Sequence, residues 1–291
     1  MNPVDIVRRI VATTPVQDWQ VPATVGIAGP IGHGKSTIAE MLHAKFGHTV
    51  IAFADHLRHV CTVALGIPRE AMTDRTLKAT PLVGFANGYR FPFDKLHPAA
   101  AVNRIDLMLA TAYDVDIEVF TNAATVANNK EMTTVGANYL SPAAVRRGAQ
   151  VLFMRHIWIP LRNGKEFSPR EIMQIVGTEI FRAIDPPIWL WMWGRRADGA
   201  GMAVAPDLRF PNECAMLKER HGMLVRVTRP DQSVDTRHVS ETLLDKYDFN
   251  VTITNDGTLE DLWHALAEVI HIYADMHKTD VDNGYAKLIT A

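Results

Sequence analysis

Residues 23–46, ATVGIAGPIGHGKSTIAEMLHAKF, decide the fold. Ala23–Ala28 is a short apolar run with the length of a buried strand. Lys35–Phe46 carries apolar residues at helical spacing, and Gly47 ends it. A strand, a glycine-rich loop and a helix in this order predict the first unit of a parallel α/β sheet.

The loop Gly29–Ser36 matches the pattern G-x-x-x-x-G-K-[ST], which binds phosphate groups when it joins a strand to a helix. Its glycines let the backbone wrap an anion, so that amide N–H groups and the positive end of the helix face the charge. Lys35 is predicted to reach the β- and γ-phosphates of ATP, and the Ser36 hydroxyl to ligate Mg²⁺. His33 is interpreted as a tolerated loop residue rather than a catalyst. The residues predicted to bind ATP are Gly29, Ile31, Gly32, His33, Gly34, Lys35, Ser36 and Thr37.

The bulk composition is that of a globular protein. Of the 291 residues, 47% are hydrophobic and 21% are charged, which excludes wholesale disorder. The net charge is −2 and no long run of Lys or Arg occurs, which argues against a surface that binds DNA strongly. Cys61 and Cys214 fit no metal-ligand spacing and are expected to be reduced core thiols. Neither an export signal nor a long apolar stretch is found, so a soluble cytoplasmic protein without membrane partners is expected.

The remaining sequence alternates between strands and helices. Further strands are predicted at 49–54, 202–208, 223–228 and 249–254. Helices are predicted at 4–11, 101–112, 141–158, 168–184, 187–193, 211–221 and from 258 onward, with a flexible turn at 198–201. The fold class is therefore α/β, with a doubly wound, mostly parallel sheet. Residues 84–140 break the pattern and are interpreted as an inserted helical or irregular segment.

Two polar features are candidates for binding the phosphoryl acceptor. Asp55 follows the predicted second strand, where it could orient Mg²⁺ or accept a proton; alternatively it caps a helix that starts at His56. Four polar residues recur every four positions on one helix: Arg170, Gln174, Thr178 and Arg182. This row suits a phosphate clamp with recognition of a base, or it is simply a solvated face. Gly177 favours the first interpretation, because it lets a ring approach the backbone.

The carboxyl end of the 202–208 strand supplies further candidates. Asp207 lies where a metal-binding carboxylate of this fold class would be, and is a candidate for binding the metal or the ribose of the acceptor. Arg209, a candidate for the acceptor phosphate, points to the same side. The alternative is that Asp207 and Asn212 only cap and turn the chain. Pro206 is unusual for a central strand. Arg195 and Arg196 are candidate lid arginines that neutralise the transferring group, or a solvated helix terminus. Arg226 and Arg229 are further candidates for contacting the nucleotide. The tryptophans Trp189, Trp191 and Trp193 are expected in the core.

Three segments besides the phosphate loop carry a resemblance to a known family: Phe53–Arg58, Pro169–Asp185 and Asp207–Glu213. Together they resemble the deoxynucleoside monophosphate kinases encoded by tailed bacteriophages, over residues 24–80 and 165–272. The resemblance implies the nucleoside monophosphate kinase fold, ATP with Mg²⁺, and the host cytoplasm as location. It also adds Arg58 and Glu213 to the acceptor-binding candidates.

These features divide the chain into five predicted segments. They are an N-terminal helix and linker (1–22), the first part of the core (23–83), the insertion with acceptor-side helices (84–165), the acceptor-binding helix, lid and remaining core (166–278), and a tail (279–291).

The predicted activity is ATP-dependent conversion of a deoxynucleoside monophosphate to the diphosphate. The catalytic candidates are Lys35, Asp55, Arg195 and Arg196, and the metal candidates are Ser36 and Asp207. A nearer alternative is a kinase that phosphorylates a hydroxymethylated base within DNA, and only this alternative requires DNA as a partner. An alternative of another class is a nucleotide-dependent switch. The oligomeric state stays open, with a dimer as one option.

Overall fold

The computed structural model describes residues 3–13, 21–74, 76–82, 98–121, 138, 140–230 and 243–276. The predicted linker after the first helix, much of the 84–140 segment and the tail after residue 278 lie outside these ranges. The chain divides into two compact units. We call Met1–Phe53 with Gly194–Ala291 the sheet unit, and Ala54–Trp193 the helical unit. These division points differ from the predicted segments, because composition along the chain does not reveal which parts share a core.

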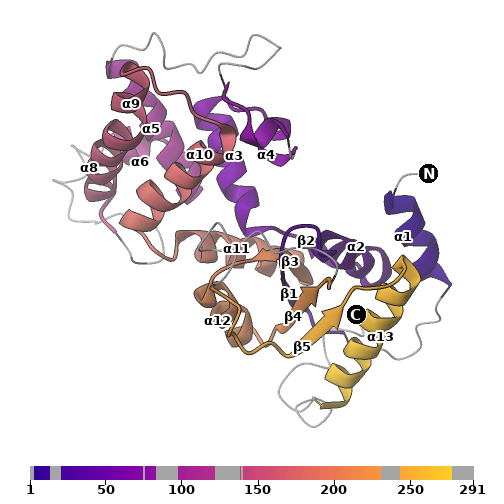
Figure 1. The fold of residues 1–291 in the computed structure, drawn as a ribbon. Coiled ribbons are helices and arrows are strands. Elements are labelled where there is room, and N and C mark those ends of the chain that lie inside the picture. Colours follow the sequence, from indigo (N-terminus) through magenta and orange to yellow (C-terminus); the bar gives the residue numbers. More distant parts are fainter. Residues whose placement is uncertain are drawn as a thin grey trace. The chain divides into compact units, whose positions relative to one another are not determined.

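The sheet unit contains five parallel strands in the order β2-β3-β1-β4-β5 (Figure 1). The strands are β1 (Thr24–Ala28), β2 (Thr49–Val50), β3 (Ala203–Leu208), β4 (Met223–Thr228) and β5 (Val251–Thr254). The helices of this unit are α1 (Pro3–Ala12), α2 (Lys35–Phe46), α12 (Pro211–Glu219) and α13 (Leu259–Met276). The α/β class and the parallel sheet predicted from the sequence are confirmed, with β1 at the centre of the sheet.

Helices cover both faces of this sheet, which explains its continuous apolar strands. Val25 and Ile27 of β1 share a buried cluster with residues of α1, α2 and α13. Gly26, whose position faces the other side, lies against Leu217 of α12: a Cβ there would come within 2.5 Å of Leu217 Cδ1. Only glycine lets α12 pack this closely on β1.

The second strand is shorter than predicted. β2 contains only Thr49 and Val50, both exposed at the edge of the sheet, and α3 (Phe53–Leu65) begins three residues later. Asp55 therefore lies in the first turn of α3, and the alternative interpretation of Asp55 as the cap of a helix starting at His56 is wrong. The apolar run that suggested a long strand instead supplies Phe53, which is buried, to the start of the helix.

Pro206 is accommodated in β3 by an irregular register. β1 and β3 pair from Thr24↔Ala203 to Gly26↔Ala205, and pairing resumes at Ala28↔Leu208 after a shift. β2, the neighbour on the other side, pairs only with Ala203 and Val204. Pro206, which has no N–H to donate, thus lies beyond the pairing with β2 and at the shift in the pairing with β1.

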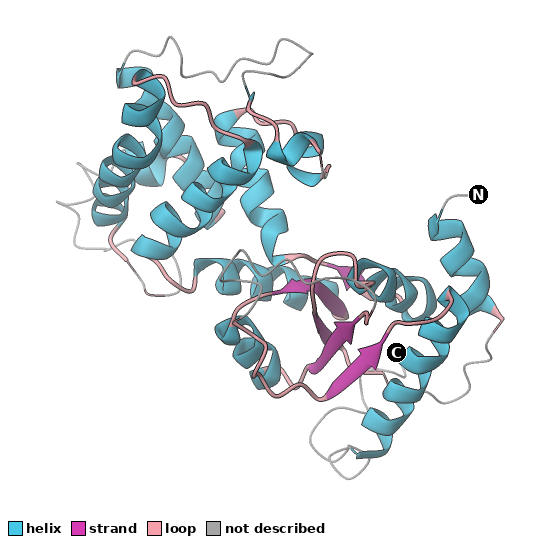
Figure 2. Ribbon diagram, in the orientation of Figure 1, coloured by secondary structure: helices cyan, strands magenta, loops and turns pink. Residues whose placement is uncertain are grey.

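The helical unit, whose described residues form no strand of the sheet, is built on its own core (Figure 2). Besides most of α3 it contains the α-helices α4 (Arg69–Thr73), α5 (Pro98–Tyr113), α6 (Glu118–Thr121), α8 (Pro142–Phe153), α9 (Ile159–Arg162) and α10 (Pro169–Gln174). η1 (Leu77–Ala79) is a 3₁₀ turn, while η3 (Met154–Trp158) and η4 (Ile175–Arg182) are wide π-helical turns that continue α8 and α10.

A local start signal predicted α10 correctly. Ser168 caps α10 through its hydroxyl, which accepts from the Glu171 backbone N–H, while Glu171 accepts from the Ser168 N–H. The predicted helix at 101–112 is the middle of α5. Trp189 and Trp193 are buried and Trp191 packs partly buried against the core, as expected.

The turn predicted at 198–201 is wrong. α11 (Ile188–Ala200) continues through Asp198 and Gly199, and only Gly201 turns in the left-handed region. Arg220 stabilises this extension, since its guanidinium donates to Asp198 and to the carbonyl of Gly194. The predicted helix at 211–221 ends earlier, at Glu219, and His221 takes the left-handed conformation beyond its end.

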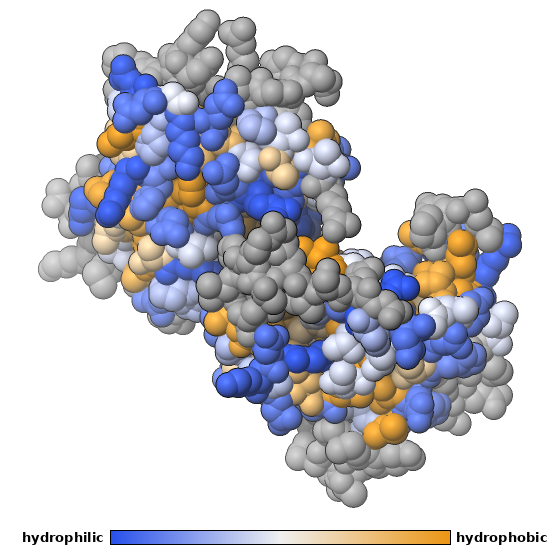
Figure 3. Space-filling model, viewed as in Figure 1, coloured by the Kyte–Doolittle hydropathy of each residue, from blue (hydrophilic) through white to orange (hydrophobic). Residues whose placement is uncertain are grey.

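Both cysteines are buried free thiols, as predicted. Burial raises the pKa of Cys61 in the helical unit and of Cys214 in the sheet unit, each to about 12. Hydrophilic and hydrophobic residues are interspersed on the face drawn in Figure 3. Within the described ranges, no helix is long and apolar enough to cross a membrane.

Candidate active site

The glycine-rich loop has the backbone that its sequence predicted. Gly29, Gly32 and Gly34 have φ angles of 143°, 86° and 106°, which side chains disfavour. A Cβ on Gly29 would also come within 2.2 Å of the carbonyl oxygen of Val227 in β4. The loop follows the central strand and leads into α2, so it lies at the carboxyl edge of the sheet, where open α/β folds bind their ligands.

The first turn of α2 is suited to an anion. Its N-cap is Gly34, which has no side chain to accept the amide hydrogens at the start of the helix. Lys35 curls over the loop and donates from Nζ to the carbonyl oxygens of Gly29 and Pro30. Ser36 is exposed and Thr37 is half-buried in the same turn, and Ile31 at the loop tip is 49% exposed. The residues predicted to bind ATP therefore form one continuous segment, with amides and a lysine available to phosphate oxygens.

The side chain of His33 is buried and makes specific contacts, so His33 is more than the tolerated loop residue that the sequence suggested. Only 2% of it is exposed, and Nδ1 accepts a hydrogen bond of 2.8 Å from the backbone N–H of Arg229. The carbonyl oxygen of His33 accepts a second bond, of 2.9 Å, from Asn255 Nδ2. Burial, and then the charges of Lys35 and Arg229, lower the pKa of His33, so the ring is neutral at neutral pH.

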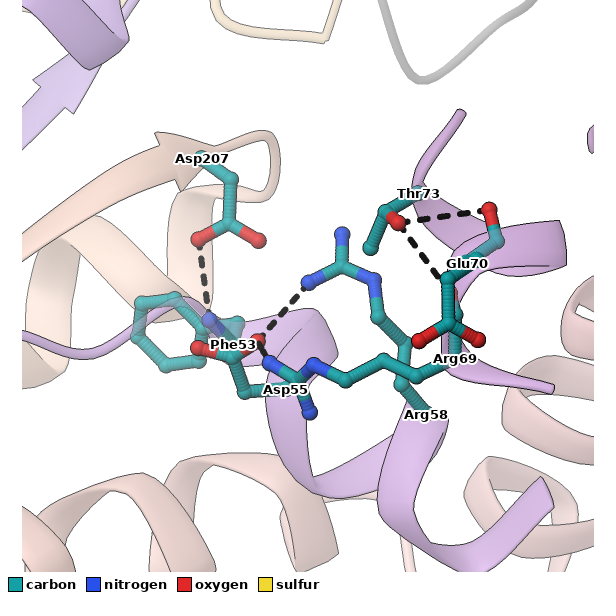
Figure 4. Close-up of polar contacts among 7 residues, drawn as sticks. All are labelled: Phe53, Asp55, Arg58, Arg69, Glu70, Thr73 and Asp207. Atoms are coloured by element: carbon teal, nitrogen blue, oxygen red, sulfur yellow. Dashed lines mark hydrogen bonds and ion pairs between the residues drawn. The ribbon is translucent and has the colours of Figure 1, made fainter. Parts of the chain in front are cut away.

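Asp207 lies next to the loop in the sheet, because its neighbour Leu208 pairs with Ala28 of β1. Its Oδ1 accepts a bond of 2.9 Å from the Phe53 backbone N–H, as drawn in Figure 4. This amide belongs to the first turn of α3, so Asp207 caps that helix from another element. Asp207 thus caps a helix distant in sequence, whereas the predicted alternative was a local cap and turn with Asn212; the N-cap of α12 is Phe210.

Asp55 holds two guanidinium groups (Figure 4). Its Oδ1 accepts from Arg58 Nη1 at 2.9 Å and from Arg69 Nη2 at 2.8 Å. The Arg58 and Asp55 side chains are 17% and 16% exposed, whereas Arg69 is 55% exposed. Arg58 Nε is buried, with no hydrogen-bond partner among the described residues. The three side chains carry a net charge of +1 and present guanidinium N–H groups, which is the chemistry that recognises phosphate.

Arg69 was not predicted from the sequence. It begins the short helix α4, and no motif marks it. The one available signal was Pro68, which restricts the backbone before a helix, but this cannot reveal that Arg69 reaches back to Asp55.

The polar row on α10 and η4 is present as predicted. Arg170, Gln174 and Thr178 are exposed and Arg182 is half-buried, while Ile172 and Val176 on the other side are fully buried. Gly177 has a different explanation from the one predicted. A Cβ there would come within 2.8 Å of Leu57 Cδ2, and the Gly177 carbonyl oxygen accepts from the Trp189 indole at 3.0 Å. Gly177 thus makes room for α3 and α11 within the helical unit.

The candidate residues on either side of β3 in the sequence divide into exposed and buried ones. Arg209 is exposed, and so are Arg195 and Arg196 on the surface of α11. Glu213 is only 2% exposed, and its Oε2 accepts from the backbone N–H groups of Arg209 and Phe210. Glu213 therefore fixes the backbone of Arg209 at the start of α12.

The candidates belong to both units. The sheet unit contains the residues predicted to bind ATP. It also contains Asp207, Arg209, Glu213, Arg195 and Arg196. The helical unit contains Asp55, Arg58, Arg170, Gln174, Thr178 and Arg182. In this unit Asp55, Arg58 and Arg69 form one hydrogen-bonded group. The loop and Asp207 converge within the sheet unit through the pairing of β1 with β3.

A parallel sheet whose central strand leads through a glycine-rich loop into a helix defines an α/β protein of the P-loop kinase-like type. The chain belongs to the deoxynucleotide monophosphate kinase family, whose model matches residues 25–266. The resemblance carried by the sequence motifs is thereby confirmed at the level of the family.

Two viral proteins are similar to parts of the chain. The deoxynucleotide monophosphate kinase of Enterobacteria phage T4 is 26% identical over 113 residues, which cover 37% of this chain and 47% of that protein. A protein of Acanthamoeba polyphaga mimivirus, provisionally given the same name, is 26% identical over 125 residues, which cover 38% of this chain and 65% of that protein. The chain thus matches about half to two thirds of the length of these relatives.

Proposed function

We propose that the protein transfers the γ-phosphoryl group of ATP to a free deoxynucleoside monophosphate, giving ADP and the deoxynucleoside diphosphate. The observation that carries the proposal is the left-handed glycine backbone of the loop before α2, in a chain that belongs to the deoxynucleotide monophosphate kinase family. The viral relatives support the acceptor class through their names.

On the donor side, the amides of the loop and of the first turn of α2 bind the β- and γ-phosphates. Lys35, whose Nζ already donates to loop carbonyl oxygens, redirects its N–H groups to the phosphates and neutralises charge on the transferring group. Ser36 and the carboxylate of Asp207 are the proposed protein ligands of Mg²⁺, which would supply further charge neutralisation when bound.

On the acceptor side, arginines recognise the monophosphate. Asp55 orients Arg58 and Arg69, whose guanidinium groups can each donate two hydrogen bonds to phosphate oxygens. Further proposed phosphate ligands are Arg170, Arg182 and Arg209. Gln174 and Thr178 suit the edge of the base. The acceptor oxygen is already anionic, so it needs no general base. Asp55 thus acts through the arginines in this proposal, and Arg195 and Arg196 neutralise the transferring group.

The reaction is an in-line displacement. A bond forms between an acceptor phosphate oxygen and the γ-phosphorus, while the bond from that phosphorus to the β–γ bridging oxygen breaks and ADP leaves. Catalysis therefore consists of positioning and charge neutralisation.

The test is to offer labelled ATP with each of the four common deoxynucleoside monophosphates, and with a hydroxymethylated oligonucleotide, at low and high salt. We expect ADP formation with at least one free monophosphate, at a kcat above about 1 s⁻¹. Turnover confined to the oligonucleotide and weakened steeply by salt would indicate the DNA-base kinase. ATP hydrolysis indifferent to every acceptor would indicate a switch.

Replacement of Lys35 tests the donor side. We expect Lys35→Ala to lower kcat by about 100- to 1,000-fold, the usual effect of removing one donor to a developing charge. The side chain is not part of the buried core, so the thermal midpoint of the variant should stay close to that of the wild type. Turnover within tenfold of the wild type would contradict the role of this lysine.

A further inference from the structure

The phosphate loop is braced from beneath by the ends of two strands. β4 leads into Arg229, whose backbone N–H donates to His33 Nδ1, and β5 leads into Asn255, whose Nδ2 donates to the His33 carbonyl oxygen. Both bonds end on the same loop residue, one on its side chain and one on its backbone. Both partners follow strands of the sheet core, so the brace ties the loop to rigid elements.

The brace is buried and closely fitted. His33 is 2% exposed and Asn255 8% exposed. A Cβ added to Gly34 would come within 2.6 Å of Asn255 Nδ2, so the Asn255 amide lies directly against the N-cap residue of α2. Any shift of Asn255 would thus be passed to the amides of Gly34 and Lys35.

The geometry defines the tautomer that the brace requires. Nδ1 accepts a hydrogen from a backbone amide, so it carries no proton, and the proton of the neutral ring resides on Nε2. A protonated ring would place an N–H at Nδ1, opposite the N–H of Arg229, and the bond would be lost. Among the described residues, the charged groups that act on the ring are Lys35, from α2, and Arg229, from the segment after β4.

We propose that His33 and Asn255 are positioning residues for the donor nucleotide: they hold the phosphate loop in its binding conformation, through a neutral Nδ1 acceptor and a side-chain amide donor. The inference rests on the proposed binding of ATP by this loop. Neither residue has to touch the nucleotide.

The first test separates the acceptor atom from the bulk of the side chain. Asn and Leu have similar shapes, but only Asn offers an oxygen where His offers Nδ1. In calorimetric titrations of the full chain with ATP, we expect His33→Leu to weaken binding by about 5- to 50-fold, as for a buried donor left without its partner. His33→Asn should bind within about threefold of the wild type, and KM for the acceptor should stay unchanged in both variants.

The second test uses the two asparagines that flank β5. Asn250 accepts from the Leu224 N–H with its oxygen, whereas Asn255 donates with its nitrogen. Replacement by Asp keeps the oxygen acceptor that Asn250 uses but removes the N–H donor that Asn255 uses. Asn255→Asp should therefore weaken ATP binding by about 5- to 50-fold, and Asn250→Asp should leave it unchanged. Asn255→Leu, which adds no charge, should resemble Asn255→Asp.

The third test is the pH dependence of ATP binding. At each pH the ATP affinity of the wild type is divided by that of His33→Asn, because the titration of ATP itself affects both proteins equally and cancels. The pKa of His33 lies below its ordinary value, so the neutral ring is present at neutral pH and is lost only as the pH falls through that lowered pKa. The ratio of affinities should therefore be flat at neutral pH and should fall in acid.

The outcomes are distinct. If the wild type binds no ATP, the proposed function fails together with this inference. If the wild type binds ATP and His33→Leu binds equally well, or His33→Asn binds as weakly as His33→Leu, only the brace is overturned. A ratio of ATP affinities that rises in acid would also overturn the brace, and would indicate that His33 acts through a positive charge. Where His33→Leu does not fold, the asparagine pair and the pH ratio decide.

Discussion

Asp55 presents one carboxylate oxygen to two arginines, which changes what the residue can do. Its Oδ1 accepts hydrogen bonds from both Arg58 and Arg69. A role in taking a proton from the acceptor is not needed when the acceptor oxygen is already anionic. The effect of Asp55 on the proposed reaction is instead to fix the direction of the two guanidinium groups. Arg69, the more exposed member, depends most on this restraint because it has the most freedom to lose.

Arg69→Ala should impair use of the acceptor and leave binding of ATP intact. We expect kcat/KM for the monophosphate to fall by about 10- to 100-fold, since hydrogen bonds to charged groups contribute about 1.5–3 kcal/mol. Arg147, an exposed arginine on α8, is the matched control, and Arg147→Ala should leave both constants unchanged. Steady-state kinetics with each substrate varied in turn measure the effect. Equal losses for ATP and the monophosphate would show that Arg69 acts on the fold and not on the acceptor.

At the level of elements, the start of α3 depends on a residue more than a hundred positions away. Asp207 supplies the hydrogen-bond acceptor that the first amide of the helix lacks. The same carboxylate is a proposed ligand of Mg²⁺, and the two roles can be separated because they need different properties. Capping requires an oxygen acceptor, and metal binding requires negative charge.

We therefore expect Asp207→Asn to keep the free energy of unfolding within about 0.5 kcal/mol of the wild type while kcat falls by at least about tenfold. Asp207→Ala should be as inactive and also less stable, by about 1 kcal/mol. Denaturant unfolding and initial rates on the same samples give both numbers. Full activity of Asp207→Asn would remove Asp207 from the metal site and leave it only the cap.

Elements with local signals could be predicted from the sequence. The start of α10 at Ser168, the strand–loop–helix around Lys35 and the cap of α13 at Thr258 all depend on neighbours within a few residues. β2 could not be predicted correctly, because whether an apolar run forms a strand or starts a helix is decided by its partner, here the Asp207 carboxylate. The roles of Arg69 and His33 could not be predicted for the same reason, because their hydrogen-bond partners lie 14 and 196 residues away in the sequence.

At the level of the whole molecule, each unit contains one buried thiol. Cys61 lies in the core of the helical unit and Cys214 in the sheet unit, both without measurable exposure. Because each pKa is raised to about 12, little thiolate exists at pH 8 in the native state. Each cysteine reacts only when its own surroundings open, so each reports on the stability of one unit.

In a labelling experiment at pH 8, we expect both cysteines of the native protein to react at least about 100-fold more slowly than in the denatured chain. Peptide mass spectrometry after short pulses of a thiol reagent, across a denaturant series, separates the two sites. Each site should then give the unfolding midpoint of its own unit. Fast labelling of either cysteine without denaturant would contradict its placement in a core.

The order of the strands also determines when each unit can be completed during synthesis. β1 is made early, yet both of its partners, β3 and β4, begin only at residues 203 and 223. Every residue of the helical unit, up to Trp193, is synthesised before either partner exists. On a growing chain the helical unit can therefore fold first, while the phosphate loop waits beside an unpaired strand and forms last.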